Sequence, residues 1–191
     1  MKGIYIFLAD GFEETEAFAT LDMLRRAELP VKTVSTQYDK FVVGAHKVPV
    51  VADMVFGEFK ANLELEGTDE GDIMIFPGGL PGAQSLADNK DLMSLAKLHW
   101  MEGGAIAAIC AAPGLVVSQL PHLEGRKFTC YAGFEKNLLD KGAVHCNAPA
   151  VVDGNLITGR GPGCAIEFGL SIVGYLCGEE VQEQVRAGLL I

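Results

Sequence analysis

Short apolar runs alternate with segments of helical periodicity along most of the chain. A helix between two apolar runs is typical of a βαβ unit, in which the two strands are parallel neighbours in one sheet. The sequence therefore predicts an α/β fold with a doubly wound, mostly parallel sheet and helices on both of its faces. The expected strands occupy residues 3–8, 31–35, 72–76, 105–109 and 127–131, and the expected helices occupy 13–27, 82–87, 90–102, 111–120, 162–176 and a short segment from Glu179.

Three further features complete the expected organisation. Residues 41–51 are expected to form a strand pair, and residues 150–158 a hairpin that turns at an Asp-Gly pair. The polar stretch 56–71 has no clear periodicity, so no regular element is expected there. Helix 162–176 is apolar almost all round, which indicates burial on every side.

The overall composition excludes several classes of partner. Hydrophobic residues make up 49% of the 191 residues, and no linker divides them, so residues 1–191 are expected to form one domain. The net charge of −10 argues against nucleic acid and against an anionic membrane surface, which both select clustered Lys and Arg. No apolar run reaches the ~18 residues of a membrane span. We therefore expect a soluble protein of the cytoplasm.

The cysteines and histidines are scattered along the chain. The five cysteines include no C-x-x-C pair, which indicates free thiols in a reducing compartment. The four histidines form no cluster with them at metal-ligand spacing, so each is interpreted as a surface or structural residue. We expect no metal and no cofactor. The cysteines are Cys110, Cys130, Cys146, Cys164 and Cys177, and the histidines are His46, His99, His122 and His145.

Cys110 lies where a buried strand meets a helix. The segment from Ala105 to Gly114 reads AIAAICAAPG, with small residues on both sides of the cysteine that allow a tight turn. This pattern is typical of a nucleophile elbow. The N-terminus of the following helix lowers the pKa of a nearby thiol, so position alone is expected to activate Cys110. The alternative is an inert core cysteine, because free Cys is among the most buried residue types.

Two other strand ends are expected to lie near Cys110, because parallel strands meet at one edge of the sheet. The turn Pro77-Gly78-Gly79 could direct N–H groups of Gly78 and Gly79 at an anion beside the cysteine, together with the N–H group of Ala111. A plain turn is the alternative.

An acidic helix start, with Glu13, Glu14 and Glu16, follows the first strand. Any of the three could be a solvated residue that favours the helix dipole, and periodicity does not choose among them. A carboxyl buried beside the cysteine would have a raised pKa and could act as a proton donor. Arg160, before the last long helix, could bind an anion or a partner, although a role in fixing its turn is the simpler interpretation.

Four motifs, in this order, resemble the ThiJ/PfpI superfamily and specifically its DJ-one branch. They are LADGFEETE at 8–16, FPGGLPGAQ at 76–84, AAICAAP at 107–113 and GRGPG at 159–163, followed by Glu167-Phe168. The resemblance covers nearly the whole chain. It implies a flavodoxin-like sandwich, usually assembled as a homodimer.

The resemblance also implies roles for single residues. Cys110 would be the reactive cysteine, Glu16 the carboxyl that hydrogen-bonds it, and Arg26 a residue near an anion-binding pocket. Two positions depart from close relatives, which often carry a histidine where this chain has Tyr131 and a pocket arginine roughly where it has His46. A histidine proton shuttle is therefore not expected, and Glu16 is the better acid or base.

The family's activities imply three functions. The first is a cofactor-free glyoxalase or deglycase that acts on small reactive carbonyl compounds through Cys110. The second is a sensor of oxidative stress, or a protein-protecting module, in which Cys110 is oxidised. The third is a cysteine peptidase or amidase, which is disfavoured because Ala111 occupies the place of the histidine that follows the cysteine in the protease branch.

Overall fold

A seven-stranded sheet forms the centre of the computed structural model, which describes residues 2–63 and 71–191. The strand order is β10-β11-β7-β6-β1-β2-β5, and every neighbouring pair is parallel except the β10–β11 hairpin. This arrangement confirms the predicted flavodoxin-like α/β fold. The strands are β1 Ile4–Leu8, β2 Val31–Ser35, β5 Met54–Val55, β6 Ile73–Phe76, β7 Ala105–Ile109, β10 Ala150–Asp153 and β11 Leu156–Gly159.

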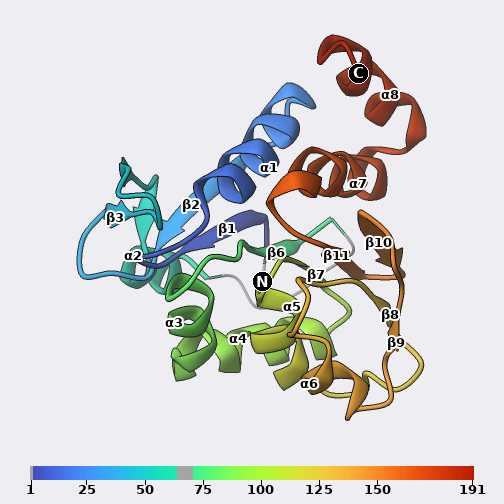
Figure 1. Cartoon of the computed structure of the whole chain (residues 1–191). Coiled ribbons are helices and arrows are strands. Elements are labelled where there is room, and N and C mark those ends of the chain that lie inside the picture. The colour runs from blue at the N-terminus through green and yellow to red at the C-terminus, as the bar shows by residue number, and fades with distance from the viewer. Residues whose placement is uncertain (1, 64–70) are drawn as a thin grey trace.

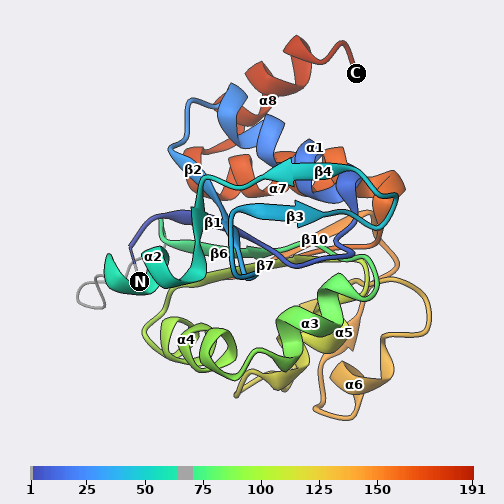
Figure 2. The same cartoon turned by 90° about the vertical axis from the view of Figure 1, so that its left-hand side faces the viewer.

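Helices cover both faces of the sheet and produce three layers (Figures 1 and 2). One face carries α1 Glu14–Arg26, α7 Ala165–Cys177 and α8 Glu179–Gly188. The other face carries α3 Gly82–Asp88, α4 Lys90–Met101, α5 Ala112–Leu115 and α6 Lys136–Leu139. Each face has its own buried apolar cluster, because the parallel strands present apolar side chains to both sides.

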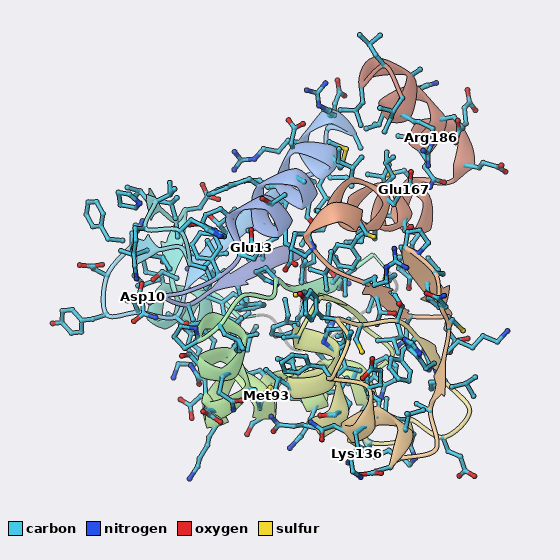
Figure 3. All side chains as sticks on the ribbon, viewed as in Figure 1. Asp10, Glu13, Met93, Lys136, Glu167 and Arg186 are labelled. Atoms are coloured by element: carbon cyan, nitrogen blue, oxygen red, sulfur yellow. The ribbon has the colours of Figure 1, made fainter. Side chains whose placement is uncertain are left out.

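The outermost helix is held by an ion pair. Arg186 of α8 binds both carboxylate oxygens of Glu167 in α7, at 2.8 and 3.1 Å, and the two side chains point toward each other in Figure 3. The fork geometry of arginine favours this bidentate contact.

Short elements lie outside the central sheet. β3 Phe41–Val43 and β4 Pro49–Val51 form the antiparallel pair predicted at 41–51. β8 Lys127–Phe128 pairs in parallel with β9 Val144–His145. Two 3-10 turns, at Val117–Gln119 and Pro162–Cys164, and the helix α2 Phe56–Ala61 complete the set.

The structure differs from the sequence expectations in three elements. The helix expected at 111–120 ends at Leu115, because Gly114 and the β-branched pair Val116 and Val117 are poor helix formers. The strand expected at 127–131 ends at Phe128. Helix α7 is not buried on every side, since Ile166 is exposed in this outer layer.

The stretch 56–71 contains one element that the sequence did not reveal. Phe56 and Phe59, three residues apart in α2, pack their rings on Phe7 of β1. Two aromatic residues are too few to produce a clear periodicity, so the sequence did not predict this helix. Residues 64–70 of that stretch lie outside the described residues.

Four neighbouring parallel strands, β1, β6, β7 and β11, end at the same edge of the sheet. The residues that directly follow these ends are Ala9, Pro77, Cys110 and Arg160. No helix within the described ranges is long and apolar enough to cross a membrane.

Candidate active site

Cys110 sits at the sharp turn between β7 and α5. Its backbone has a φ of +65°, a left-handed conformation that costs a non-glycine residue about 1–2 kcal/mol. Two hydrogen bonds hold it there: its N–H donates to the Gly159 carbonyl at 3.0 Å, and its carbonyl accepts from the Tyr131 N–H at 2.8 Å. The side chain is 8% exposed. The turn therefore has the strained geometry of a nucleophile elbow.

Glu16, on the first turn of α1, is the carboxyl that faces Cys110. Its side chain is fully buried, and Oε2 accepts the Gly78 N–H at 2.7 Å. Among the described residues, Oε1 has no hydrogen-bond partner. Burial raises the pKa of Glu16 to about 7, against the smaller lowering effects of the Gly78 N–H and the Cys110 side chain. A carboxyl with this pKa can take up or release a proton at neutral pH.

Gly78 brings the two groups together. A Cβ atom at this position would lie 2.5 Å from the Cys110 Cβ, 2.7 Å from Glu16 Oε2 and 3.0 Å from the sulfur. The carbonyl of Gly78 also accepts the N–H of Glu13, which ties the strand end to the start of α1. Only glycine leaves room for the carboxyl and the thiol to interact.

The surroundings of the Cys110 thiol shift its pKa in opposite directions. Burial, followed by the charge and hydrogen bond of Glu16, raises its pKa to about 12, whereas the backbone N–H groups of Gly79 and Ala111 lower it. Burial and Glu16 oppose the effect of the helix start on the pKa of Cys110, and activation by position alone stays a prediction. α5 has only four residues, and its N–H groups do not outweigh burial and a neighbouring carboxylate.

The pair instead supports activation by proton transfer. While Glu16 is ionised it can accept the thiol proton as the sulfur attacks, and the two N–H groups that contact the sulfur stabilise the negative charge formed there. A preformed thiolate is not required. Because the groups are coupled, the proton belongs to the pair rather than to either residue.

The predicted oxyanion donors divide into two roles. The N–H groups of Gly79 and Ala111 contact Cys110, as the motif predicted. The N–H group of Gly78 is directed at Glu16 instead, so it positions the carboxyl and does not serve as a donor to an anion.

A surface pocket of about 390 Å³ adjoins the elbow. Tyr131 and Arg160 both line it, together with Cys164 of the 3-10 turn after β11. Tyr131 is half exposed, and its backbone is bonded to Cys110. Arg160 donates to Asn147 Oδ1 at 3.2 Å. The structure thus brings together two of the four predicted pocket residues.

The other two predicted pocket residues lie elsewhere. Arg26 ends α1, ten residues after Glu16, which is about 15 Å along a helix. It pairs with Asp22 at 2.7 Å and lines a separate hollow against α8. His46 is exposed and pairs with Glu14 at 2.8 Å. These two carboxylates, Glu14 and Glu13, raise the pKa of His46.

None of the interactions that shift the pKa of Cys110 comes from a histidine. His99 is buried and bonded to the carbonyl of Ala105, His145 packs on Phe128, and His122 lines a hollow with Trp100. Cys110 is therefore not part of a cysteine–histidine pair within the chain.

The absence of a metal stays a prediction, and the structure adds one observation to it. The fold gathers two groups of three potential ligands that are spread out in the sequence, so spacing did not reveal them. They are Cys130, Glu135 and His145, and Glu13, Glu14 and His46.

Comparisons with known proteins identify the family of the chain. Residues 2–174 match the model of the DJ-1/PfpI family. The chain is 36% identical over 188 residues to Protein DJ-1 homolog B of Arabidopsis thaliana, covering 98% of this chain and 41% of that protein. It thus spans less than half the length of this Arabidopsis relative.

Two further relatives match over nearly their whole lengths. Protein dj-1beta of Drosophila melanogaster is 33% identical and is covered to 97%. Its crystal structure superimposes with a TM-score of 0.87 over 100% of this chain and 98% of that one, at 32% identity. "Glutathione-independent glyoxalase DJ-1" of Schizosaccharomyces pombe is 27% identical, covering 99% of this chain and 98% of that protein. This chain belongs to the DJ-1/PfpI family.

Proposed function

We propose that the protein is a cofactor-free glyoxalase that converts small 2-oxoaldehydes into 2-hydroxy acids, with deglycase-type release of carbonyl adducts as a related reaction. The observation that carries the proposal is the buried pair of Cys110 and Glu16, a thiol beside a carboxyl whose pKa is about 7. The relative from Schizosaccharomyces pombe that is named as a glyoxalase supports this reaction class.

The first step forms a covalent adduct. The Cys110 sulfur attacks the aldehyde carbon, and the thiol proton passes to the Glu16 carboxylate. The carbonyl oxygen takes up the negative charge beside the N–H groups of Gly79 and Ala111 and is then protonated by Glu16. The product is a hemithioacetal, and Glu16 is again ionised.

The second step moves a hydrogen between the two carbons through an enediol. Glu16 removes the proton from the former aldehyde carbon and delivers it to the ketone oxygen, which gives the enediol. Glu16 then removes the proton of the other hydroxyl group and delivers it to the former ketone carbon, which gives a thioester of Cys110. The aldehyde carbon is oxidised and the ketone carbon is reduced, so no external oxidant or cofactor is needed. Water then hydrolyses the resulting thioester, releasing the hydroxy acid and the Cys110 thiol.

Turnover of methylglyoxal to lactate tests the proposal directly. Purified protein is assayed in the presence of a chelator, beside the variants Cys110→Ala and Cys177→Ala. We expect lactate from the wild type and from Cys177→Ala, because Cys177 lies at the end of α7 away from the elbow. Equal lactate formation by Cys110→Ala would refute the mechanism.

The second candidate is a redox sensor. Two molecules of hydrogen peroxide would oxidise the Cys110 sulfur to a sulfinate, releasing two molecules of water, and Glu16 with the neighbouring N–H groups would hold the oxygens. Oxidation follows thiolate character, however, and burial raises the pKa of Cys110, which disfavours the thiolate. Intact-mass analysis after peroxide treatment separates the two functions: a selective two-oxygen adduct on Cys110 favours the sensor.

A peptidase has the least support, since no histidine acts on Cys110 within the chain. A homodimer is proposed on the family resemblance. Light scattering after size-exclusion chromatography tests it, and a monomer would also remove any histidine supplied by a second subunit.

A further inference from the structure

A second cysteine environment lies beside the active-site turn. Cys130, Glu135 and His145 each place one potential ligand atom so that all three atoms lie within 4.8 Å of one another. They come from three segments: the end of β8, the start of α6 and the end of β9, which neighbour one another at the same side of the molecule (Figure 1). None of these residues has a role in the proposed reaction.

Two of the three potential ligands have a contact of their own. The carboxylate of Glu135 accepts the N–H of Gly133 at 2.8 Å through Oε2. The ring of His145 packs on Phe128, its partner in the β8–β9 register, with 5.3 Å between ring centroids. Cys130 is buried, whereas His145 is exposed, so the group opens to solvent on the histidine side.

We propose that Cys130, Glu135 and His145 form a binding site for a single Zn²⁺ ion. A thiolate, an imidazole and a carboxylate are the ligand types that zinc prefers, and three protein ligands leave the fourth tetrahedral position to water. Tetrahedral zinc places its ligand atoms about 3.3–3.8 Å apart, given metal–ligand distances of about 2.0–2.3 Å. The three ligand atoms lie within 4.8 Å of one another, and the exposed side chain of His145 can move toward the other two by a change of rotamer.

The rival group is a poorer zinc site. Glu13, Glu14 and His46 offer no sulfur, and His46 already forms an ion pair with Glu14 at 2.8 Å. Hard carboxylate oxygens with one imidazole favour zinc less than a set that includes a thiolate. The variant His46→Ala therefore serves as the matched control.

The position of the site links it to the pocket beside Cys110. Tyr131 follows Cys130 directly, lines that pocket and donates its N–H to the Cys110 carbonyl. An ion bound to Cys130, Glu135 and His145 would join three segments of the chain through one centre. Zinc is therefore expected to fix the Tyr131 loop and to raise the Tm of the protein.

The experiment measures Zn²⁺ affinity on the full chain in a Cys110→Ala background, which removes the reactive thiol as a competing ligand. We expect one Zn²⁺ per chain. Adding His145→Ala or Cys130→Ser should weaken binding at least about 100-fold, since loss of even an outer-shell partner costs about 10- to 100-fold. Adding His46→Ala should leave the affinity unchanged.

Cobalt provides a second readout. Co²⁺ bound at this site should show an intense thiolate-to-metal charge-transfer band, which Cys130→Ser removes and His46→Ala retains. Because Cys130 is buried, the fold of that variant is checked by circular dichroism, and the exposed His145→Ala decides the question if Cys130→Ser is unstable. Absence of stoichiometric zinc binding, or binding that survives His145→Ala, would overturn the proposal.

Discussion

Cys110 and Cys130 are both buried thiols beside a carboxylate, and each has a pKa raised to about 12. Their surroundings differ in every other respect. Cys110 has a strained backbone, two N–H groups directed at its sulfur and a fully buried carboxyl as neighbour. Cys130 has a half-buried carboxylate and an exposed imidazole. Burial alone therefore does not define a reactive cysteine: the first thiol is equipped to lose its proton during attack, and the second to exchange it for a cation.

Removing the Cys110 sulfur should have the largest effect. Cys110→Ala is expected to reduce methylglyoxal turnover by at least about 10³-fold, because the covalent path is lost. Lactate formation by the purified variant, with Cys177→Ala beside it, measures this. In the wild type, iodoacetamide should label Cys110 faster than Cys130, as peptide mass mapping can determine. Faster labelling of Cys130 would reverse the comparison between the two thiols.

Replacing the neighbouring carboxyl tests how Cys110 is activated. Glu16→Gln should lower kcat by about 10²–10⁴-fold, the usual contribution of a positioned acid or base. It should also lower the pKa of the Cys110 thiol, because the variant removes the negative charge and the hydrogen-bond acceptor that raise it. A titration of thiol absorbance gives the second value. A higher thiol pKa in the variant would mean that Glu16 acts chiefly as a protonated donor to a thiolate.

The division between what the sequence predicted and what it missed follows from how local each feature is. The strands and the Cys110 elbow are recorded in contiguous residues, so apolar runs and small flanking residues revealed them. Glu16 is distinguished from Glu13 and Glu14 by its contact with Gly78. Gly78 is distant in the sequence, so the periodicity of the helix cannot reveal this contact. The group around Cys130 depends on the pairing of β8 with β9, which are separated in the sequence by a segment that includes α6. The direction in which the pKa of Cys110 shifts depends on burial, which cannot be read from a sequence motif.

The buried carboxyl should also make stability depend on pH. The pKa of Glu16 is about 7 in the folded chain and its ordinary value is 4.5, so between these values the folded chain retains a proton that the unfolded chain has lost. Stability therefore falls as pH rises through this window, by about 3 kcal/mol at 1.36 kcal/mol per pKa unit. Because glutamine does not ionise, the variant Glu16→Gln should not show this decrease in stability.

The same window contains an opposing group, so only a difference between variants isolates Glu16. Burial lowers the pKa of His99 to about 4, which makes stability rise with pH between about 4 and 6.5. This contribution is common to the wild type and Glu16→Gln and cancels on subtraction. Urea unfolding of both proteins from pH 4 to pH 8 gives the difference. A constant difference across that range would show that Glu16 ionises normally.

Gly78→Ala tests the close approach of Glu16 to Cys110, a feature that Cys130 lacks. The added methyl group would fall between the thiol and the carboxyl, within 3.0 Å of both side chains. Forcing a group into a packed site costs about 1–3 kcal/mol, and here it would also separate Cys110 from Glu16. The free energy of unfolding, measured with urea, and the rate of lactate formation should both decrease. Full activity with normal stability would mean that the two groups do not need their present contact.

Arg26→Ala should have the smallest effect on activity and stability. The variant tests whether Arg26 lies near the substrate, as the family resemblance implies, or away from it, as in the structure. The resemblance places Arg26 near an anion-binding pocket, whereas the structure places it at the far end of α1, paired with Asp22 and exposed. An exposed pair within one helix contributes about 0.3–0.5 kcal/mol, so stability should change by no more than that. The kcat and KM for methylglyoxal should equal those of the wild type, while Arg160→Ala should raise KM because Arg160 lines the pocket beside Cys110. If KM rises in Arg26→Ala but not in Arg160→Ala, substrate reaches Cys110 from the α1 side. The pocket lined by Tyr131 and Arg160 would then not be the substrate-binding pocket.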